Sequence, residues 1–214
     1  MNNNIDISKL PQALPIFPLP GAIVLPRGSL PLNIFEPRYI AMIDSILGSH
    51  RMIGMIQPIE SRHNKALYPV GCGARITAFS ETSDNRYVIE LKGIIRFKII
   101  TEIESSNSFR IVKPNWVPYK ADLDLKFEDI NISELLYELK MYFNHNSINV
   151  DFDEISKIPN EQIIAAVPQI CSFKPNEKQA VLEAISEQDR VEVLTSLLKM
   201  NFTNENNSDN QTIN

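Results

Sequence analysis

The sequence predicts an α+β protein in which a twisted, partly closed β-sheet domain, residues 1–118, is followed by a helical bundle, residues 119–200. All seven glycines lie between Gly21 and Gly93, and glycine serves turns and bulges of β structure but weakens helices. Apolar residues alternate with period two in the first part and recur with a period of about 3.6 in the second. The polar, Asn-rich segment 201–214 is predicted to be disordered.

The segment from Leu14 to Tyr39 is apolar and rich in proline. A helix is excluded here because each proline removes an amide donor and clashes with the preceding turn. The apolar runs between the prolines therefore indicate short strands separated by turns. The prolines stand at positions 15, 18, 20, 26 and 31, and the segment closes with the cluster Ile34-Phe35-Glu36-Pro37-Arg38-Tyr39.

A strand from Tyr87 to Ile99 is indicated by period-2 alternation, with apolar residues on one parity and mostly charged residues on the other. The charged parity includes Arg96 and Lys98, which are expected on a solvent-exposed face. Gly93 falls on the inward parity and indicates a bend or a bulge. Other elements expected in this half are a strand over 74–81 that pairs with the first across a turn at 82–85, strands over 52–56 and 109–117, and a helix over 38–47.

Residues 120–200 show helical periodicity. Leu135, Leu139 and Phe143 would line one side of the first helix, and Pro175 is a favourable first-turn residue for a later one. Helices are predicted over 132–143, 161–167, 175–185 and 187–199. So many helices in so short a segment should pack together as a bundle.

The charge is divided in the same way as the glycines. Residues 1–119 hold 13 basic and 9 acidic side chains, and residues 120–214 hold 8 and 17, which gives a net charge of -5. That balance favours neither a nucleic-acid binder nor a binder of anionic membranes. The sequence shows no signal peptide and no apolar run of membrane-spanning length, and it holds only two cysteines. We therefore expect a cytoplasmic protein.

Several motifs resemble the amino-terminal, substrate-binding domain of Lon-type ATP-dependent proteases. The resemblance covers roughly residues 12–200. It departs from the family at Asn85, where glycine is common in the hairpin turn. The motifs that carry it are the Leu-Pro-rich opening and Phe35-Glu36-Pro37-Arg38-Tyr39, then Gly71-Cys72-Gly73-Ala74, Leu91-Lys92-Gly93-Ile94-Ile95-Arg96-Phe97 and Glu177-Lys178-Gln179.

The resemblance implies non-catalytic recognition of unfolded polypeptide or of a protein partner. The chain contains no G-x-x-x-x-G-K-[ST] phosphate loop, so neither enzymatic activity nor a cofactor is expected. The family also implies a PUA-like pseudo-barrel for the β domain, since its β domain resembles that class of RNA-binding barrels. An RNA-binding module is therefore one alternative, although no basic and aromatic cluster is evident, and a protein–protein scaffold is another.

The candidate substrate-binding residues come from two clusters. Both have an alternative structural role: Arg38 can satisfy a carboxylate while Tyr39 packs in the core, and Trp116 and Tyr119, near the predicted domain boundary, can pack the two domains together. A groove at that boundary would let a ligand touch both domains. The candidates are Phe35, Glu36, Arg38, Tyr39, Trp116 and Tyr119, and Phe17 and Phe173 are further residues that could back an apolar patch.

Metal binding and nucleophilic catalysis are not expected. The cysteines and histidines, Cys72, Cys171, His50, His63 and His145, have no close ligand spacing. No G-x-S-x-G nucleophile elbow occurs. A free cysteine usually behaves as a small buried apolar residue, and we expect that role for both cysteines.

Overall fold

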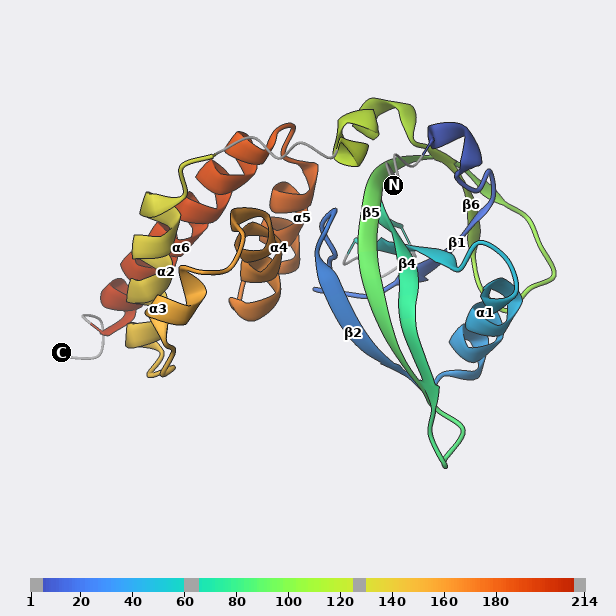
Figure 1. Cartoon of the computed structure of the whole chain (residues 1–214), viewed down its shortest axis with the longest axis horizontal. Helices are drawn as coiled ribbons and strands as arrows, with labels where there is room; N and C mark the ends of the chain where they lie inside the picture. The colour runs from blue at the N-terminus through green and yellow to red at the C-terminus, as the bar shows by residue number, and fades with distance from the viewer. Residues whose placement is uncertain (1–5, 60–65, 125–129, 210–214) are drawn as a thin grey trace. The chain divides into compact units, whose positions relative to one another are not determined.

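The computed structural model describes residues 6–59, 66–124 and 130–209, with side chains described up to Asn201. The chain divides into two compact units, Met1–Phe127 and Glu128–Asn214. We call them the β unit and the helical unit and describe each by itself. Together they make an α+β protein (Figure 1).

The β unit is built on one six-stranded sheet with the strand order β2-β5-β4-β3-β1-β6. Strands β1 and β3 are parallel, and the other pairs are antiparallel. The long strand β5 also pairs with β6, so the pairings from β5 through β4, β3, β1 and β6 return to β5. The elements are η1 (Ile7–Lys9), β1 (Leu14–Pro18), β2 (Ser29–Ile34), α1 (Pro37–Leu47), β3 (Met52–Ile56), β4 (Val70–Glu81), β5 (Tyr87–Ile103), β6 (Ile111–Asn115) and η2 (Val117–Leu123).

Strand β5 contains the bulge that Gly93 predicts. Its ladder advances from Gly93 to Ile95 while β4 moves by a single residue, from Ala74 to Gly73. A Cβ on Gly93 would lie 2.0 Å from the carbonyl oxygen of Leu25, so only glycine fits this close approach of two backbones. The extra residue in β5 reverses which side of the sheet the odd-numbered residues face.

The reversal lets one strand contribute to two cores. After the bulge, Ile95 and Phe97 pack with Leu14 and Trp116 in a buried apolar cluster. Before the bulge, Leu91 is buried on the other side of the sheet. Helix α1 covers that second side: Tyr87 of β5 donates from its hydroxyl to Asp44 of α1 at 2.8 Å. The expectation of one inward and one outward face along the whole strand is therefore wrong beyond the bulge.

Helix α1 has the predicted position and the predicted buried face. Pro37 provides its first turn, where the missing amide donor costs nothing. Its buried residues are Tyr39, Met42, Ile43 and Ile46, which recur at the spacing of one helical face. The β4–β5 turn is also as predicted, because Asn85 holds the left-handed backbone there with a φ of 58°.

The helical unit contains α2 (Ser133–His145), α3 (Phe152–Ile155), α4 (Asn160–Ile170), α5 (Pro175–Glu183) and α6 (Glu187–Asp209). Helices α2, α4 and α5 each contact α6, around buried residues that include Leu135, Leu139, Val181 and Leu194. The four predicted helices are present, and the short α3 was not expected. Helix α6 continues to Asp209, into the segment 201–214 for which the composition predicts disorder.

Candidate functional site

The segment Phe35–Tyr39 joins β2 to α1, and its residues differ sharply in exposure. Phe35 is 62% exposed. Arg38 donates from Nε to Glu36 Oε2 at 2.9 Å, and its Nη2 lies 2.7 Å from the same oxygen. The Arg38 guanidinium carbon also lies 4.5 Å from the centre of the Tyr39 ring. Glu36, Arg38 and Tyr39 therefore form one local cluster, with Phe35 beside it in solvent.

Tyr39 belongs to the core rather than to the surface. It is buried, and its ring centroid lies 4.1 Å from that of Phe17. Burial raises the pKa of Tyr39, and the neighbouring Arg38 cation opposes that rise. Phe17 and Phe173, the other two phenylalanines considered for an apolar patch, are also buried. Of these aromatic candidates, only Phe35 is available to a ligand.

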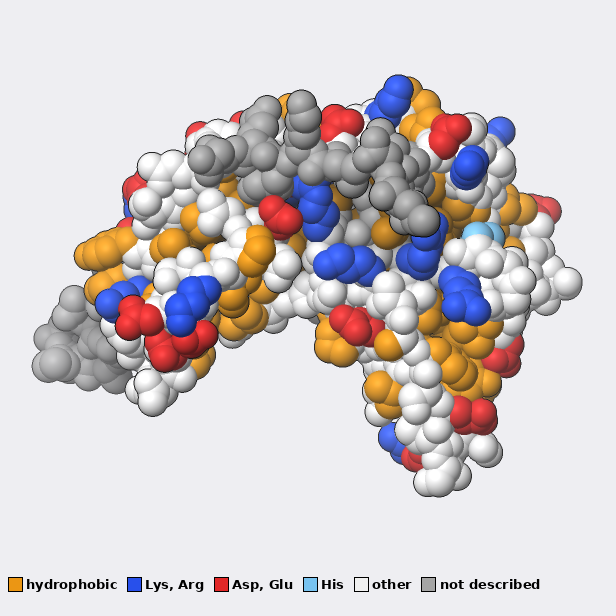
Figure 2. Space-filling model, viewed as in Figure 1, with side chains coloured by type: hydrophobic (Ala, Val, Ile, Leu, Met, Phe, Trp, Pro, Cys, Tyr) orange, Lys and Arg blue, Asp and Glu red, His pale blue; other side chains and the backbone are white. Residues whose placement is uncertain are grey.

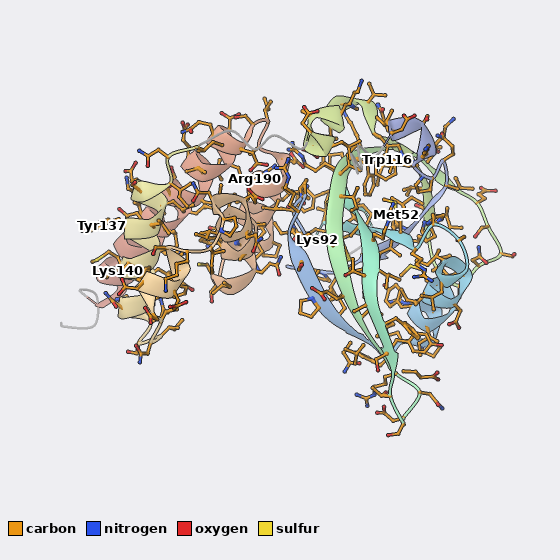
Figure 3. All side chains as sticks on the ribbon, in the orientation of Figure 1. Met52, Lys92, Trp116, Tyr137, Lys140 and Arg190 are labelled. Atoms are coloured by element: carbon orange, nitrogen blue, oxygen red, sulfur yellow. The ribbon has the colours of Figure 1, made fainter. Side chains whose placement is uncertain are left out.

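Trp116 lies inside the β unit. Its side chain is buried, its ring centroid lies 5.6 Å from that of Phe97, and Nε1 donates to the carbonyl oxygen of Pro11 at 3.1 Å. A Cβ on Gly73 would lie only 2.8 Å from the Trp116 ring, so the indole fills the space that this glycine leaves. The sequence predicted that Trp116 packs between two domains or lines a groove. Trp116 instead lies in the core of one unit (Figure 3).

Tyr119 belongs to a second arginine–carboxylate cluster. The guanidinium carbon of Arg96 lies 4.6 Å from the Tyr119 ring centre, and Arg96 Nη2 donates to Asp122 Oδ1 at 2.8 Å. The Arg96 backbone amide also donates to Asp122 Oδ2 at 2.9 Å. Arg96 and Asp122 are only 4% and 5% exposed. The expectation that Arg96 lies on a solvated face is wrong, because η2 covers this part of β5, whereas Lys98 is exposed as expected.

The two groups of predicted residues are not brought together. Phe35 follows Ile34, which pairs with Tyr87 at the beginning of β5. Trp116 follows Asn115, which pairs with Lys98 much farther along the same strand. The predicted residues therefore fall into one group beside the β4–β5 hairpin, where Phe35 is exposed, and a second group beneath η2, where Trp116 is buried.

The hairpin has two exposed apolar residues that were not predicted as candidates, and one of them, Val88 of β5, accompanies Phe35. The guanidinium carbon of Arg86 lies 6.0 Å from the Phe35 ring centre. The other, Phe79 of β4, is paired with Ile89 and therefore faces the opposite side of the hairpin from Val88. We call Phe35 and Val88 the hairpin apolar surface; the hairpin extends from the sheet at the lower end of the β unit in Figure 1. A signal was present in the sequence, because Val88 is apolar and lies on the parity that holds Glu90, Lys92, Arg96 and Lys98.

A cavity of about 690 Å³ lies in the loop between β5 and β6. Its one cation is already paired: Arg110 donates to both carboxylate oxygens of Glu102, at 2.7 and 2.8 Å. This pairing lowers the pKa of Glu102. The loop therefore offers no unpaired cation to an anionic ligand, and Glu104 adds a further negative charge to its lining.

The described part of the chain holds no group of three or more His, Cys, Asp or Glu residues placed to bind a metal. Cys72 and Cys171 are buried free thiols, and burial raises the pKa of Cys171 to about 12. His63 lies outside the described residues. None of the described helices is both long enough and apolar enough to cross a membrane.

Comparison with known proteins gives the family. Residues 13–200 match the profile of the ATP-dependent protease La (LON) substrate-binding domain. The chain belongs to this family. It is similar to the Lon protease of Syntrophus aciditrophicus, with 21% identity over 92% of this chain and 26% of that protein. It is also similar to Lon protease 2 of Myxococcus xanthus, with 24% identity over 91% of this chain and 24% of that protein. The chain thus spans about a quarter of the length of these relatives.

Solved Lon amino-terminal domains share the fold of this family member. The amino-terminal domain of the Mycobacterium avium complex Lon protease superposes with a TM-score of 0.62 at 16% identity, over 87% of this chain and 98% of that one. A Lon N-terminal domain protein from Xanthomonas campestris gives a TM-score of 0.59 at 17% identity, over 86% and 97%. At such identities the likeness concerns the fold alone. The match to the substrate-binding family supports a role in substrate recognition.

Proposed function

We propose that this chain binds unfolded or apolar polypeptide without cleaving it, and that the hairpin apolar surface makes the contact. The carrying observation is the exposure of Phe35, at 62%. The exposed Val88 accompanies Phe35, and apolar side chains that are exposed together on a domain surface often mark an interaction site. Family membership supports the same role, since the matched family is named for substrate binding.

The local structure holds Phe35 ready for contact. The residue before it, Ile34, is buried and paired with Tyr87, and the residues after it begin α1. The backbone on both sides of Phe35 is therefore fixed, so binding orders little more than one side chain. Aromatic anchors of this kind contribute strongly to transient interfaces.

The test is a peptide titration followed by fluorescence anisotropy. We expect labelled peptides of denatured casein to bind with dissociation constants on the order of micromolar, and Phe35→Ala to weaken binding about tenfold. The matched control is Tyr137→Ala, because Tyr137 lies in the helical unit and is 61% exposed (Figure 3). Thermal unfolding of each variant separates lost contact from lost fold. Equal binding by wild type and Phe35→Ala would contradict the assignment of this surface.

The absence of catalysis is tested separately. Incubation with casein and ATP should leave both intact. Cleavage that is stimulated by ATP and persists through repurification would overturn the non-catalytic proposal.

The description of the β unit as a PUA-like pseudo-barrel is also kept as a proposal, supported by the pairing of β5 with both β4 and β6. RNA binding is the corresponding alternative function. If the protein ignores denatured casein peptides but shifts a structured RNA at physiological salt, RNA binding replaces the peptide proposal.

A further inference from the structure

Two cations face each other across the exposed part of the sheet. In the ladders, Lys92 of β5 lies directly opposite Arg75 of β4, and on its other side it lies opposite Ser29 of β2. Residues directly opposite in an antiparallel pair point to the same side, with Cβ atoms about 5 Å apart. Arg75 is exposed and Lys92 is partly exposed. Like charges in this arrangement destabilise a sheet, so the pair costs folding free energy.

Within the described residues neither Arg75 nor Lys92 takes part in an ion pair. His50 lies close to Arg75. Burial lowers the pKa of His50, and the Arg75 cation lowers it further, which favours the neutral imidazole. Figure 2 shows basic side chains gathered on one face of the β unit beside a histidine, and Figure 3, in the same orientation, labels Lys92.

The cation pair and part of the hairpin apolar surface share one face of β5. Val88 lies on the same side of the strand as Lys92, because both precede the bulge and are separated by an even number of residues. The distance between them along the strand is about 13 Å at the rise of about 3.3 Å per residue. An extended polypeptide of about five residues therefore reaches from Val88 to the cations.

We propose that the pair Arg75 and Lys92 binds acidic side chains of the polypeptide whose apolar residues contact the hairpin apolar surface. The inference rests on the proposed function and adds the class of substrate: segments that combine apolar residues with Asp or Glu. The argument is one of charge complementarity: Arg75 and Lys92 have no ion-pair partner among the described residues, and an anion between them would relieve their mutual repulsion.

Polypeptide is favoured over nucleic acid as the source of the anions. Glu90 lies between Val88 and Lys92 on the same side of β5 and would repel a phosphate backbone that follows the strand. A single pair of cations also gives few phosphate contacts, whereas nucleic-acid affinity depends on many. A peptide, unlike a nucleic acid, need not be charged at every position, so its carboxylates can lie at the cations and away from Glu90.

The test uses short fluorescein-labelled peptides of alternating sequence that are identical except for Asp, Asn or Lys at the polar positions. For the wild-type protein at low salt we expect the Asp peptide to bind about tenfold more tightly than the Lys peptide, with the Asn peptide between them. The preference should shrink in about 0.5 M salt, because exposed charges are then screened.

The deciding variant is the double charge reversal Arg75→Glu with Lys92→Glu. It keeps two like charges opposite each other, so the stability of the sheet should change little, but it should reverse the order of the Asp and Lys peptides. The matched control is Lys98→Glu with Lys113→Glu, which changes the net charge equally at exposed positions of β5 and β6 away from the pair. The control should keep the wild-type order.

Each other outcome has a distinct meaning. If all three peptides bind the wild type equally, or if the control reverses the order as well, the proposed anion site is wrong while peptide binding itself stands. If none of the peptides binds, the proposed peptide-binding function is wrong, and the anion site that rests on it is wrong as well. If a single-stranded RNA binds more tightly than the Asp peptide and is lost in the Arg75/Lys92 variant, the cations recognise phosphate and the polypeptide assignment is overturned.

Discussion

Two clusters of the β unit have the same chemistry and different surroundings. In one, Arg38 lies 2.7 Å from a Glu36 oxygen and 4.5 Å from the Tyr39 ring centre. In the other, Arg96 lies 2.8 Å from an oxygen of its carboxylate partner and 4.6 Å from an aromatic ring centre. The first ion pair is 52% and 43% exposed, the second 4% and 5%.

The comparison shows that contact geometry alone does not determine what an ion pair contributes. In water an ion pair is worth little, because each charge is already solvated. In the interior, loss of one partner leaves an unsolvated charge. The buried ion pair therefore holds η2 against β5. The exposed ion pair, which adjoins Phe35, contributes little to stability.

The largest expected effect comes from removing the carboxylate in each cluster. Asp122→Ala should destabilise the β unit by about 3–5 kcal/mol, because Arg96 stays buried without its partner, whereas Glu36→Ala should cost less than about 1 kcal/mol. Urea unfolding followed by the fluorescence of Trp116, the only tryptophan, measures both. Equal costs would show that Arg96 regains solvent and that burial does not distinguish the clusters.

A double variant sharpens the same comparison. Replacing both members of the buried pair, Arg96→Met with Asp122→Leu, should be less destabilising than Asp122→Ala alone, since no charge is left unpaired. A double variant that is worse than the single one would mean that packing around η2, rather than charge, dominates the cost.

The next effect concerns the packing beside the buried cluster. Gly73→Ala would place a Cβ 2.8 Å from the Trp116 ring, and such overpacking should cost about 1–3 kcal/mol. Gly48→Ala is the control, because a Cβ there meets nothing within 4 Å and the backbone φ is -82°. The control should be neutral or stabilising by up to about 1 kcal/mol. Similar losses for both would argue against a tight fit between Gly73 and the indole.

Much of this fold follows from local patterns in the sequence. The buried face of α1, the turn at Asn85 and the bulge at Gly93 each depend on residues close together in the chain. Period and turn chemistry express such features directly. The motifs that resemble the Lon family also predicted the fold over most of the chain, and the family match covers residues 13–200.

The exposure of the candidate residues could not be predicted in the same way. Arg96 and Lys98 share a parity, yet Arg96 is buried, because η2 brings Asp122 onto it from 26 residues away. No periodic pattern encodes that cover. Phe17 and Phe35 look equivalent in sequence, and the difference between them arises because Phe17 packs against Tyr39 while Phe35 lies past the last paired residue of β2.

Tyr39, the buried ring beside the exposed Glu36–Arg38 ion pair, supplies a pH test. Burial raises its pKa above the ordinary value of 10.0, so the unfolded chain releases this proton first. The contribution to stability is complete below about pH 10 and is lost as the pH rises above it. Tyr39→Phe should therefore gain stability relative to wild type in alkaline urea titrations, whereas the exposed Tyr137→Phe should not. A constant difference at every pH would place the Tyr39 hydroxyl in solvent.

The smallest expected effect compares two cations of the same strand, Lys92 and Arg96. Arg96 has a buried carboxylate, whereas Lys92 faces Arg75. Arg75→Glu should convert that repulsion into attraction and stabilise the β unit by about 0.5 kcal/mol. The gain should fade in about 1 M salt, because exposed charges are screened. Lys113→Glu, an exposed reversal on β6, should give no such salt-dependent gain. If Arg75→Glu also fails to stabilise at low salt, the two cations do not repel each other, and the anion site proposed between them loses its physical basis.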